Sequence, residues 1–133
     1  LKHYNNDVKD KVFAVWGLAF KPQTDDMREA PSIDIINKLR EKGAKFRAHD
    51  PVAMDVAKGI FGNKGIDYID NYYDTLKGAD ALFLITEWNQ FRRPDYEKMK
   101  SLLKTPVVFD GRNQYDIKKM TELGFIYYCI GRS

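Results

Sequence analysis

The sequence is poor in the residues that cross-link a fold or hold a metal. It contains one cysteine, Cys129, and two histidines, His3 and His49. A single cysteine excludes an internal disulfide and a cysteine-based zinc site, and two distant histidines lack the spacing of a metal site. We therefore expect no bound metal. Because Cys129 lies in the apolar run FIYYCI, we expect a buried structural thiol rather than a nucleophile.

Long apolar runs and a one-sided charge are also absent. The longest apolar runs, near residues 12–20 and 81–85, are only as long as a strand, and the N-terminus shows no signal-peptide pattern. We therefore expect a soluble, cytoplasmic protein without a membrane partner. Lys and Arg number 22 against 19 for Asp and Glu, with both signs interspersed. This even distribution argues against a dedicated nucleic-acid binder.

Neither standard glycine-rich phosphate motif occurs. The sequence contains no G-x-x-x-x-G-K-[ST] and no G-x-G-x-x-G. The run GIFGNKG at residues 59–65 has regularly spaced glycines, but it falls between an expected helix and an expected strand, which indicates a turn. The absence of a fingerprint disfavours an independent flavodoxin-like or Rossmann enzyme.

What is present is the pattern of a single α/β domain. In 133 residues, 44% of them hydrophobic, short apolar runs alternate with longer amphipathic runs. We expect a three-layer α/β/α Rossmann-like sandwich with a mostly parallel sheet of five or six strands, in the order 3-2-1-4-5 with a sixth strand added. Strands are expected at residues 11–16, 44–48, 66–69, 81–86, 106–110 and 125–130. Helices are expected at residues 32–42, 51–61, 94–103 and 116–123, with a short helical turn at 71–77.

The polar lead at residues 1–10 differs from the rest. We assign it to the end of a preceding segment or a linker, and residues 11–133 to the domain. The first residue, Leu1, is not methionine, which hints at a piece trimmed from a longer chain.

The segments that follow the strands carry the side chains that packing does not explain. In a parallel sheet these segments emerge at one edge, where ligands usually bind. They read GLAFKPQTDDMREAPS (17–32), HDP (49–51), TEWNQFRR (86–93) and DGRN (110–113). Four arginines are among the side chains expected there, and an arginine fork matches phosphate or carboxylate oxygens, so we expect an anionic ligand. The expected edge set is Lys21, Arg28, His49, Glu87, Trp88, Arg92, Arg93 and Arg112.

Several of these residues also have a purely structural interpretation. Lys21 and Arg28 are either ordinary loop charges or ligand contacts, and their shared position after the first strand balances the two. His49 fits a strand-end residue that bonds to neighbouring backbone better than an acid–base catalyst. Asp50, directly before a proline, fits a helix cap.

The four motifs together resemble the C-terminal, UDP-binding domain of the UDP-glucose 6-dehydrogenases, in the UDP-glucose/GDP-mannose dehydrogenase family. The similarity extends from about residue 12 to residue 132, and four separated motifs in the right order are more specific than any one of them. The TEW and DGRN motifs fit the UDP-glucose enzymes better than the GDP-mannose enzymes, which are similar around residues 17–32.

The resemblance implies a role for particular residues. Phe20 and Lys21 would contact the UDP part of the substrate, Arg112 would hold the nucleotide, and Arg28 would reach NAD across a domain interface. It also implies a parent enzyme that oxidises UDP-glucose to UDP-glucuronate with two NAD. The NAD-binding domain and the dimerising helical middle, which supplies the nucleophilic cysteine, are not in this sequence, and Cys129 does not match that cysteine. We therefore expect the remaining domains as partners, a homodimeric parent, and no catalytic residue here.

Three aromatic residues lie in or directly before these motifs. Trp16 departs from the family pattern, in which an aliphatic residue is usual, and we expect it to alter local packing only. Trp88 and Phe91 fit either core packing or a platform for a flat ring.

Two alternatives to a UDP-glucose 6-dehydrogenase domain stay open. One is the domain of a GDP-mannose or other nucleotide-sugar dehydrogenase. The other is a non-catalytic nucleotide-binding module that serves no dehydrogenase.

Overall fold

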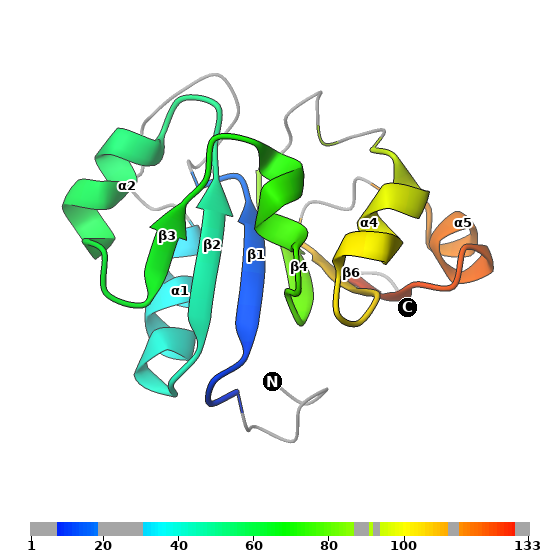
Figure 1. The fold of residues 1–133 in the computed structure, drawn as a ribbon, viewed down its shortest axis with the longest axis horizontal. Coiled ribbons are helices and arrows are strands. Elements are labelled where there is room, and N and C mark those ends of the chain that lie inside the picture. The colour runs from blue at the N-terminus through cyan, green and yellow to red at the C-terminus, as the bar shows by residue number, and fades with distance from the viewer. Residues whose placement is uncertain (1–7, 19–30, 87–90, 92–93, 112–114, 130–133) are drawn as a thin grey trace.

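The fold is a six-stranded parallel sheet with helices on both faces. The computed structural model describes residues 8–18, 31–86, 91, 94–111 and 115–129 (Figure 1). The strands lie in the order β3-β2-β1-β4-β5-β6, and every neighbouring pair is parallel. This confirms the predicted architecture and strand order, and it places the added sixth strand beside the fifth. The strands are β1 (Val12–Trp16), β2 (Lys45–His49), β3 (Ile66–Tyr68), β4 (Ala81–Leu84), β5 (Val107–Asp110) and β6 (Ile126–Cys129).

The helices occupy the crossover connections. They are α1 (Pro31–Glu41), α2 (Met54–Phe61), the 3-10 helix η2 (Tyr72–Leu76), α4 (Tyr96–Leu102) and α5 (Ile117–Glu122). Right-handed crossovers from β1 outward to β3 place α1 and α2 on one face of the sheet, and those from β4 outward to β6 place α4 and α5 on the other. Figure 1 shows α1 behind β2 and β3 and α4 in front of the sheet. None of the helices described is long and apolar enough to cross a bilayer.

Two hydrophobic clusters, one on each face, form the core. The cluster under α1 and α2 contains Phe13 and Phe46 from the sheet. The cluster under α4 and α5 contains Trp16, Met99 and Met120. Alternate residues of β1 enter opposite clusters, because successive side chains of a strand point to opposite faces.

Helix α2 begins later than its sequence predicts. The expected helix covered residues 51–61, but the helix starts at Met54 after a turn at residues 51–53. The Oδ1 atom of Asp50 accepts hydrogen bonds from the N–H groups of Val52 and Ala53, both at 2.9 Å. Asp50 therefore caps this turn, whereas the N-cap position of α2 itself has no side-chain hydrogen bond.

The buried face of α2 consists of one small residue and one ring. Ala57 and Phe61 pack into the core. The larger aliphatic side chains that recur four apart face outward, with exposed fractions of 50% for Val52, 36% for Val56 and 44% for Ile60. The spacing predicts a helix but does not show which face is buried.

Candidate functional site

The candidate site is the carboxyl edge of the sheet. The predicted ligand residues Phe20, Lys21, Arg28 and Arg112 lie outside the described residues, as do Glu87, Trp88, Arg92 and Arg93. Their roles stay predictions. These residues belong to three segments, which follow β1, β4 and β5. The first residues of each segment are described, and the three strands are parallel neighbours in the sheet. These segments therefore begin at the same edge.

A buried aspartate holds the start of the segment after β1. The Oδ2 atom of Asp50 accepts a hydrogen bond of 2.8 Å from the N–H of Leu18, while Oδ1 accepts from the turn before α2. Because Asp50 is fully buried, its carboxylate depends on these N–H donors. Asp50 thus holds the start of the segment after β1, at Leu18, which is 32 residues away in the sequence, and the start of the turn before α2. The sequence predicted the cap but not this second link.

Gly17 brings the ends of β1 and β4 unusually close. Its N–H donates to the carbonyl of His49 at 2.8 Å, and its φ is +96°. A Cβ atom added to Gly17 would lie 2.4 Å from Cβ of Thr86 and 2.6 Å from its backbone nitrogen. Only glycine combines this conformation with this space. The segment that contains Phe20 and Lys21 therefore leaves β1 directly against the end of β4.

A second buried aspartate holds the segment that contains Arg112. The Oδ2 atom of Asp110 accepts hydrogen bonds from the N–H of Tyr115, at 3.0 Å, and from the hydroxyl of Tyr127, at 2.6 Å. The N–H of Gly111 donates to the carbonyl of Leu84 at 2.9 Å. The two described residues that flank positions 112–114 are therefore held at the sheet, Gly111 by Leu84 and Tyr115 by Asp110.

Tyr115 joins this segment to the one after β4. Its hydroxyl donates a hydrogen bond of 2.6 Å to the carbonyl of Phe91. Burial raises the pKa of Tyr115 well above its ordinary value, with smaller contributions from Tyr96 and Asp110. The hydroxyl consequently stays protonated and keeps donating. The roles of Asp110 and Tyr115 were not predicted from the sequence, although an aspartate that ends an apolar strand is a usable signal.

The aromatic residues behind the edge are packed. The ring of Phe91 is fully buried and stacks on Trp16 at 5.2 Å between centroids. The core-packing interpretation is therefore confirmed for Phe91. The indole N–H of Trp16 donates to the carbonyl of Tyr72 and to Oγ1 of Thr75, at 2.9 and 3.0 Å. The departure from the family pattern at position 16 is accommodated within the core.

His49 has the structural role that its position predicts. Its Nδ1 lies 2.8 Å from the carbonyl oxygen of Ile69, and the residue is buried. It joins the end of β2 to the segment after β3, which confirms the prediction of a bond to neighbouring backbone.

The described residues do not offer a dinucleotide site of the usual kind. Such a site uses a glycine-rich turn after the first strand and an acidic residue for the ribose. Here the turn after β1 contains the single glycine Gly17, packed on Thr86, and the carboxylate of Asp50 is buried among three backbone donors. Within the described ranges, no three His, Cys, Asp or Glu side chains are grouped to hold a metal ion.

Comparison with known proteins places these features in a family. Residues 14–117 match the model of the UDP-glucose/GDP-mannose dehydrogenase family, UDP binding domain. A UDP-glucose 6-dehydrogenase of Pseudomonas aeruginosa is 47% identical over 126 residues, which cover 92% of this chain and 28% of that protein. UDP-glucose 6-dehydrogenase TuaD of Bacillus subtilis is 41% identical, over 94% of this chain and 27% of that protein. The chain thus spans little more than a quarter of these relatives.

Solved structures agree with this match. A UDP-glucose dehydrogenase from Pyrobaculum islandicum superposes with a TM-score of 0.76 at 31% identity, covering 96% of this chain and 27% of that one. An NDP-N-acetyl-D-galactosaminuronic acid dehydrogenase from Methanosarcina mazei superposes with a TM-score of 0.80 at 25% identity, covering 100% of this chain and 27% of that one.

Proposed function

Because this chain belongs to the UDP-glucose/GDP-mannose dehydrogenase family, as its UDP binding domain, we propose that it holds the substrate nucleotide in a UDP-glucose 6-dehydrogenase. The parent polypeptide oxidises UDP-glucose to UDP-glucuronate with two NAD. The observation that carries this proposal is the 47% identity to a UDP-glucose 6-dehydrogenase over 92% of the chain.

The geometry of the carboxyl edge supports this role. Asp50 fixes the start of the segment that contains Phe20 and Lys21, and Asp110 fixes the segment that contains Arg112. Both segments begin at the same edge, which supports the proposal that Lys21 and Arg112 contact one diphosphate. Charged side chains suit this task because charge-assisted hydrogen bonds to phosphate are about twice as strong as neutral ones.

NAD and the chemical step belong to the rest of the parent. The turn after β1 and the buried Asp50 do not suit a dinucleotide, so this domain contributes at most Arg28 to NAD, from across an interface. It supplies no catalytic residue. The proposal also includes a homodimeric parent and a cytoplasmic location.

The test is a substitution in the intact parent enzyme. We expect Arg112→Ala to weaken UDP-glucose binding by at least about tenfold, because a charge-assisted hydrogen bond contributes about 1.5–3 kcal/mol. Titration calorimetry measures the affinity, and circular dichroism checks the fold. Lys104→Ala is the control, since Lys104 is an exposed cation in the connection before β5, at the opposite edge. Unchanged affinity in Arg112→Ala would remove this residue from the site.

A second candidate is a dehydrogenase for another nucleotide sugar. It is favoured by the superposition on the Methanosarcina mazei enzyme, which acts on an N-acetylated sugar and matches the fold as well as the UDP-glucose enzyme does. NADH production by the parent from UDP-glucose, UDP-N-acetylmannosamine and GDP-mannose in parallel distinguishes the two. The larger kcat/KM identifies the substrate.

A further inference from the structure

One tyrosine on an outer strand of the sheet reaches both flanks of the connection that contains Arg112. Tyr127 lies on β6, and its hydroxyl donates a hydrogen bond of 2.6 Å to Oδ2 of Asp110. The same hydroxyl lies 3.0 Å from the carbonyl oxygen of Tyr115. Asp110 is two residues before Arg112, and Tyr115 is three residues after it. A single side chain from another strand therefore contacts the connection on both sides of the proposed ligand residue.

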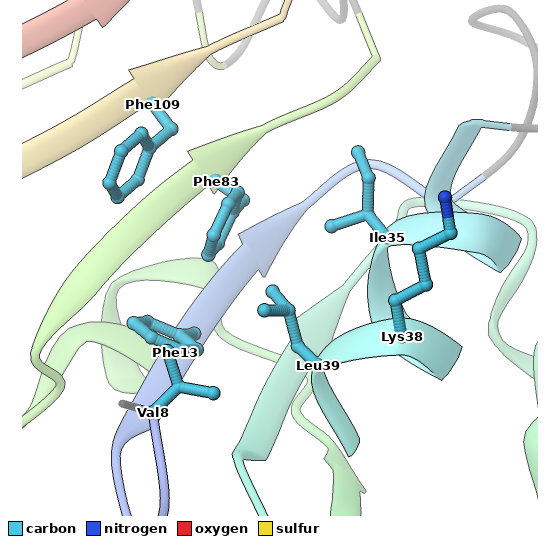
Figure 2. Close-up of a pocket in the computed structure, with 7 residues that line it drawn as sticks. All are labelled: Val8, Phe13, Ile35, Lys38, Leu39, Phe83 and Phe109. Atoms are coloured by element: carbon cyan, nitrogen blue, oxygen red, sulfur yellow. The ribbon is translucent and has the colours of Figure 1, made fainter. Parts of the chain in front are cut away.

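The pleat of the sheet explains why these groups meet. Figure 2 shows the ring of Phe109 beside that of Phe83, on the side of the sheet where α1 lies. Because successive side chains of a strand point to opposite faces, Asp110 is directed to the face of α4 and α5. Tyr127 packs against the hydrophobic cluster on that same face. The carboxylate and the hydroxyl thus lie on one side of the sheet, on neighbouring strands.

The three residues form a closed hydrogen-bonded group. Oδ2 of Asp110 also accepts a hydrogen bond of 3.0 Å from the N–H of Tyr115, so each of Asp110, Tyr115 and Tyr127 contacts the other two. Hydrogen bonds to a carboxylate are about twice as strong as those between neutral groups, so the bond to Asp110 is the stronger of the two at Tyr127. Loss of the Tyr127 hydroxyl would therefore change the hydrogen bonding of both flanks at once.

The chemistry of this group indicates a fixed geometry more than added stability. Asp110 is 1% exposed. Burying a carboxylate has a large free-energy cost that its hydrogen bonds must first offset, so such a group is a poor source of net stability. A buried polar network instead rigidifies the groups that it joins and specifies one arrangement of them. The backbone joined here is the connection from β5 to α5, which contains Arg112.

We propose that Tyr127 is a positioning residue for nucleotide binding, which acts through Asp110 and Tyr115 on Arg112. The inference rests on the proposed function, in which Arg112 contacts the diphosphate. An arginine on a backbone that is already held in one arrangement loses less conformational entropy when it binds, so its ligand is bound more tightly. Removing the Tyr127 hydroxyl should therefore weaken nucleotide binding even though Arg112 itself is retained.

The opposite margin of the sheet supplies a matched control. Tyr68 ends β3, the other outer strand, and its hydroxyl donates a hydrogen bond of 2.9 Å to the carbonyl of Gly62, which follows α2. Tyr68→Phe and Tyr127→Phe each remove one hydrogen-bonded hydroxyl and keep the ring. A general loss of stability would affect both variants, whereas a loss of positioning is specific to Tyr127→Phe.

Titration calorimetry of the full-length parent tests the proposal. We expect Tyr127→Phe to raise the Kd for UDP-glucose by about fivefold, the change that corresponds to one ordinary hydrogen bond, and Tyr68→Phe to change it by less than about twofold. UDP alone should show the same ratio, because both ligands contain the diphosphate. In turnover assays KM should rise in Tyr127→Phe while kcat stays within about twofold, as expected when ground-state and transition-state binding are lost equally. Urea unfolding checks that both variants fold.

A double-mutant cycle identifies the residue through which Tyr127 acts. When Arg112 is already alanine, Tyr127→Phe should weaken binding by less than about twofold further, because interacting residues have non-additive effects. Two independent contributions would multiply instead. Asp110→Asn is the second variant, since it weakens the acceptor of the Tyr127 hydrogen bond and leaves the tyrosine in place, and it should also raise the Kd for UDP-glucose.

Two results would overturn the proposal. One is a Kd for UDP-glucose that is unchanged in both Tyr127→Phe and Asp110→Asn. The other is a loss of affinity in Tyr127→Phe that is the same with Arg112 and with alanine at position 112. Weaker binding in Arg112→Ala together with unchanged binding in Tyr127→Phe and Asp110→Asn would remove the positioning role and leave the proposed function standing. Unchanged binding in all three variants would remove both.

Discussion

At the scale of single residues, the edge of the sheet depends on groups that act through the backbone. Asp50 and Asp110 are buried carboxylates that accept N–H groups from the segments beside them, and Gly17 supplies the space for the end of β4. Buried carboxylates are stable only when hydrogen-bonded in this way. These three residues fix where the ligand-carrying segments begin without being proposed ligands themselves.

Gly17→Ala tests the close approach of β1 and β4. We expect a loss of about 2–4 kcal/mol in the free energy of unfolding, because the added methyl group meets Thr86 and the positive φ is unfavourable for alanine. Urea unfolding measures it. The matched control is Gly59→Ala in α2, where nothing lies within 4 Å of the added carbon. There we expect a gain of about 0.5–1 kcal/mol from helix propensity. Equal effects at the two positions would contradict the structure.

At the scale of elements, side-chain hydrogen bonds hold the described ends of the connection from β5 to α5. It is fixed by Asp110 at its start and end, and by Tyr115 to the segment that contains Phe91. The hydroxyl of Tyr115 lies in a buried environment, and this burial raises its pKa well above the ordinary value of 10.0. The contribution of this connection to the free energy of unfolding therefore depends on pH in the alkaline range.

We expect the free energy of unfolding to fall as the pH rises above 10. In this range the unfolded chain releases the Tyr115 proton and the folded chain retains it, so the unfolded state binds fewer protons and stability decreases with pH. Tyr115→Phe should lower stability at neutral pH by about 1 kcal/mol, through the lost hydrogen bond, and should flatten the alkaline decrease. Urea unfolding across alkaline pH measures both effects.

Tyr68→Phe provides the comparison for this pH experiment. Burial also raises the pKa of Tyr68, but Arg40 opposes the effect. We therefore expect its removal to change the alkaline slope less than Tyr115→Phe does. An unchanged slope in Tyr115→Phe would show that its hydroxyl ionises equally in both states.

At the scale of the whole molecule, the chain forms a six-stranded sheet but corresponds to a small part of the proteins that it matches. It covers 28% of the Pseudomonas aeruginosa relative, and the described edge has no dinucleotide site of the usual kind. Positioning of the nucleotide and the chemical step are thus proposed to reside in different parts of the parent.

The chain alone should therefore produce no NADH from NAD and UDP-glucose. NADH absorbance measures turnover, and the full-length parent under the same conditions is the positive control. Turnover by the chain that disappears in Cys129→Ser would contradict the assignment, because it would make Cys129 the nucleophile.

The sequence alone was sufficient to predict the sheet, its strand order and the edge at which ligands are expected. The strand segments follow from local apolar periodicity and the common edge follows from parallel crossovers, whereas the strand order is that of the Rossmann-like class. The bond of His49 to backbone was predictable from its place at the end of a strand, although its partner, Ile69, lies 20 residues away.

Only the tertiary structure decided which surfaces are buried and which distant groups meet. Val52, Val56 and Ile60 have helical spacing, yet they are exposed, and Ala57 and Phe61 are the residues of α2 that face the core. The bond from Asp50 to Leu18 joins residues 32 positions apart, and the stacked rings of Phe83, Phe109 and Tyr128 come from three strands brought together. Such contacts depend on the packing of the whole chain, and local periodicity contains no information about them.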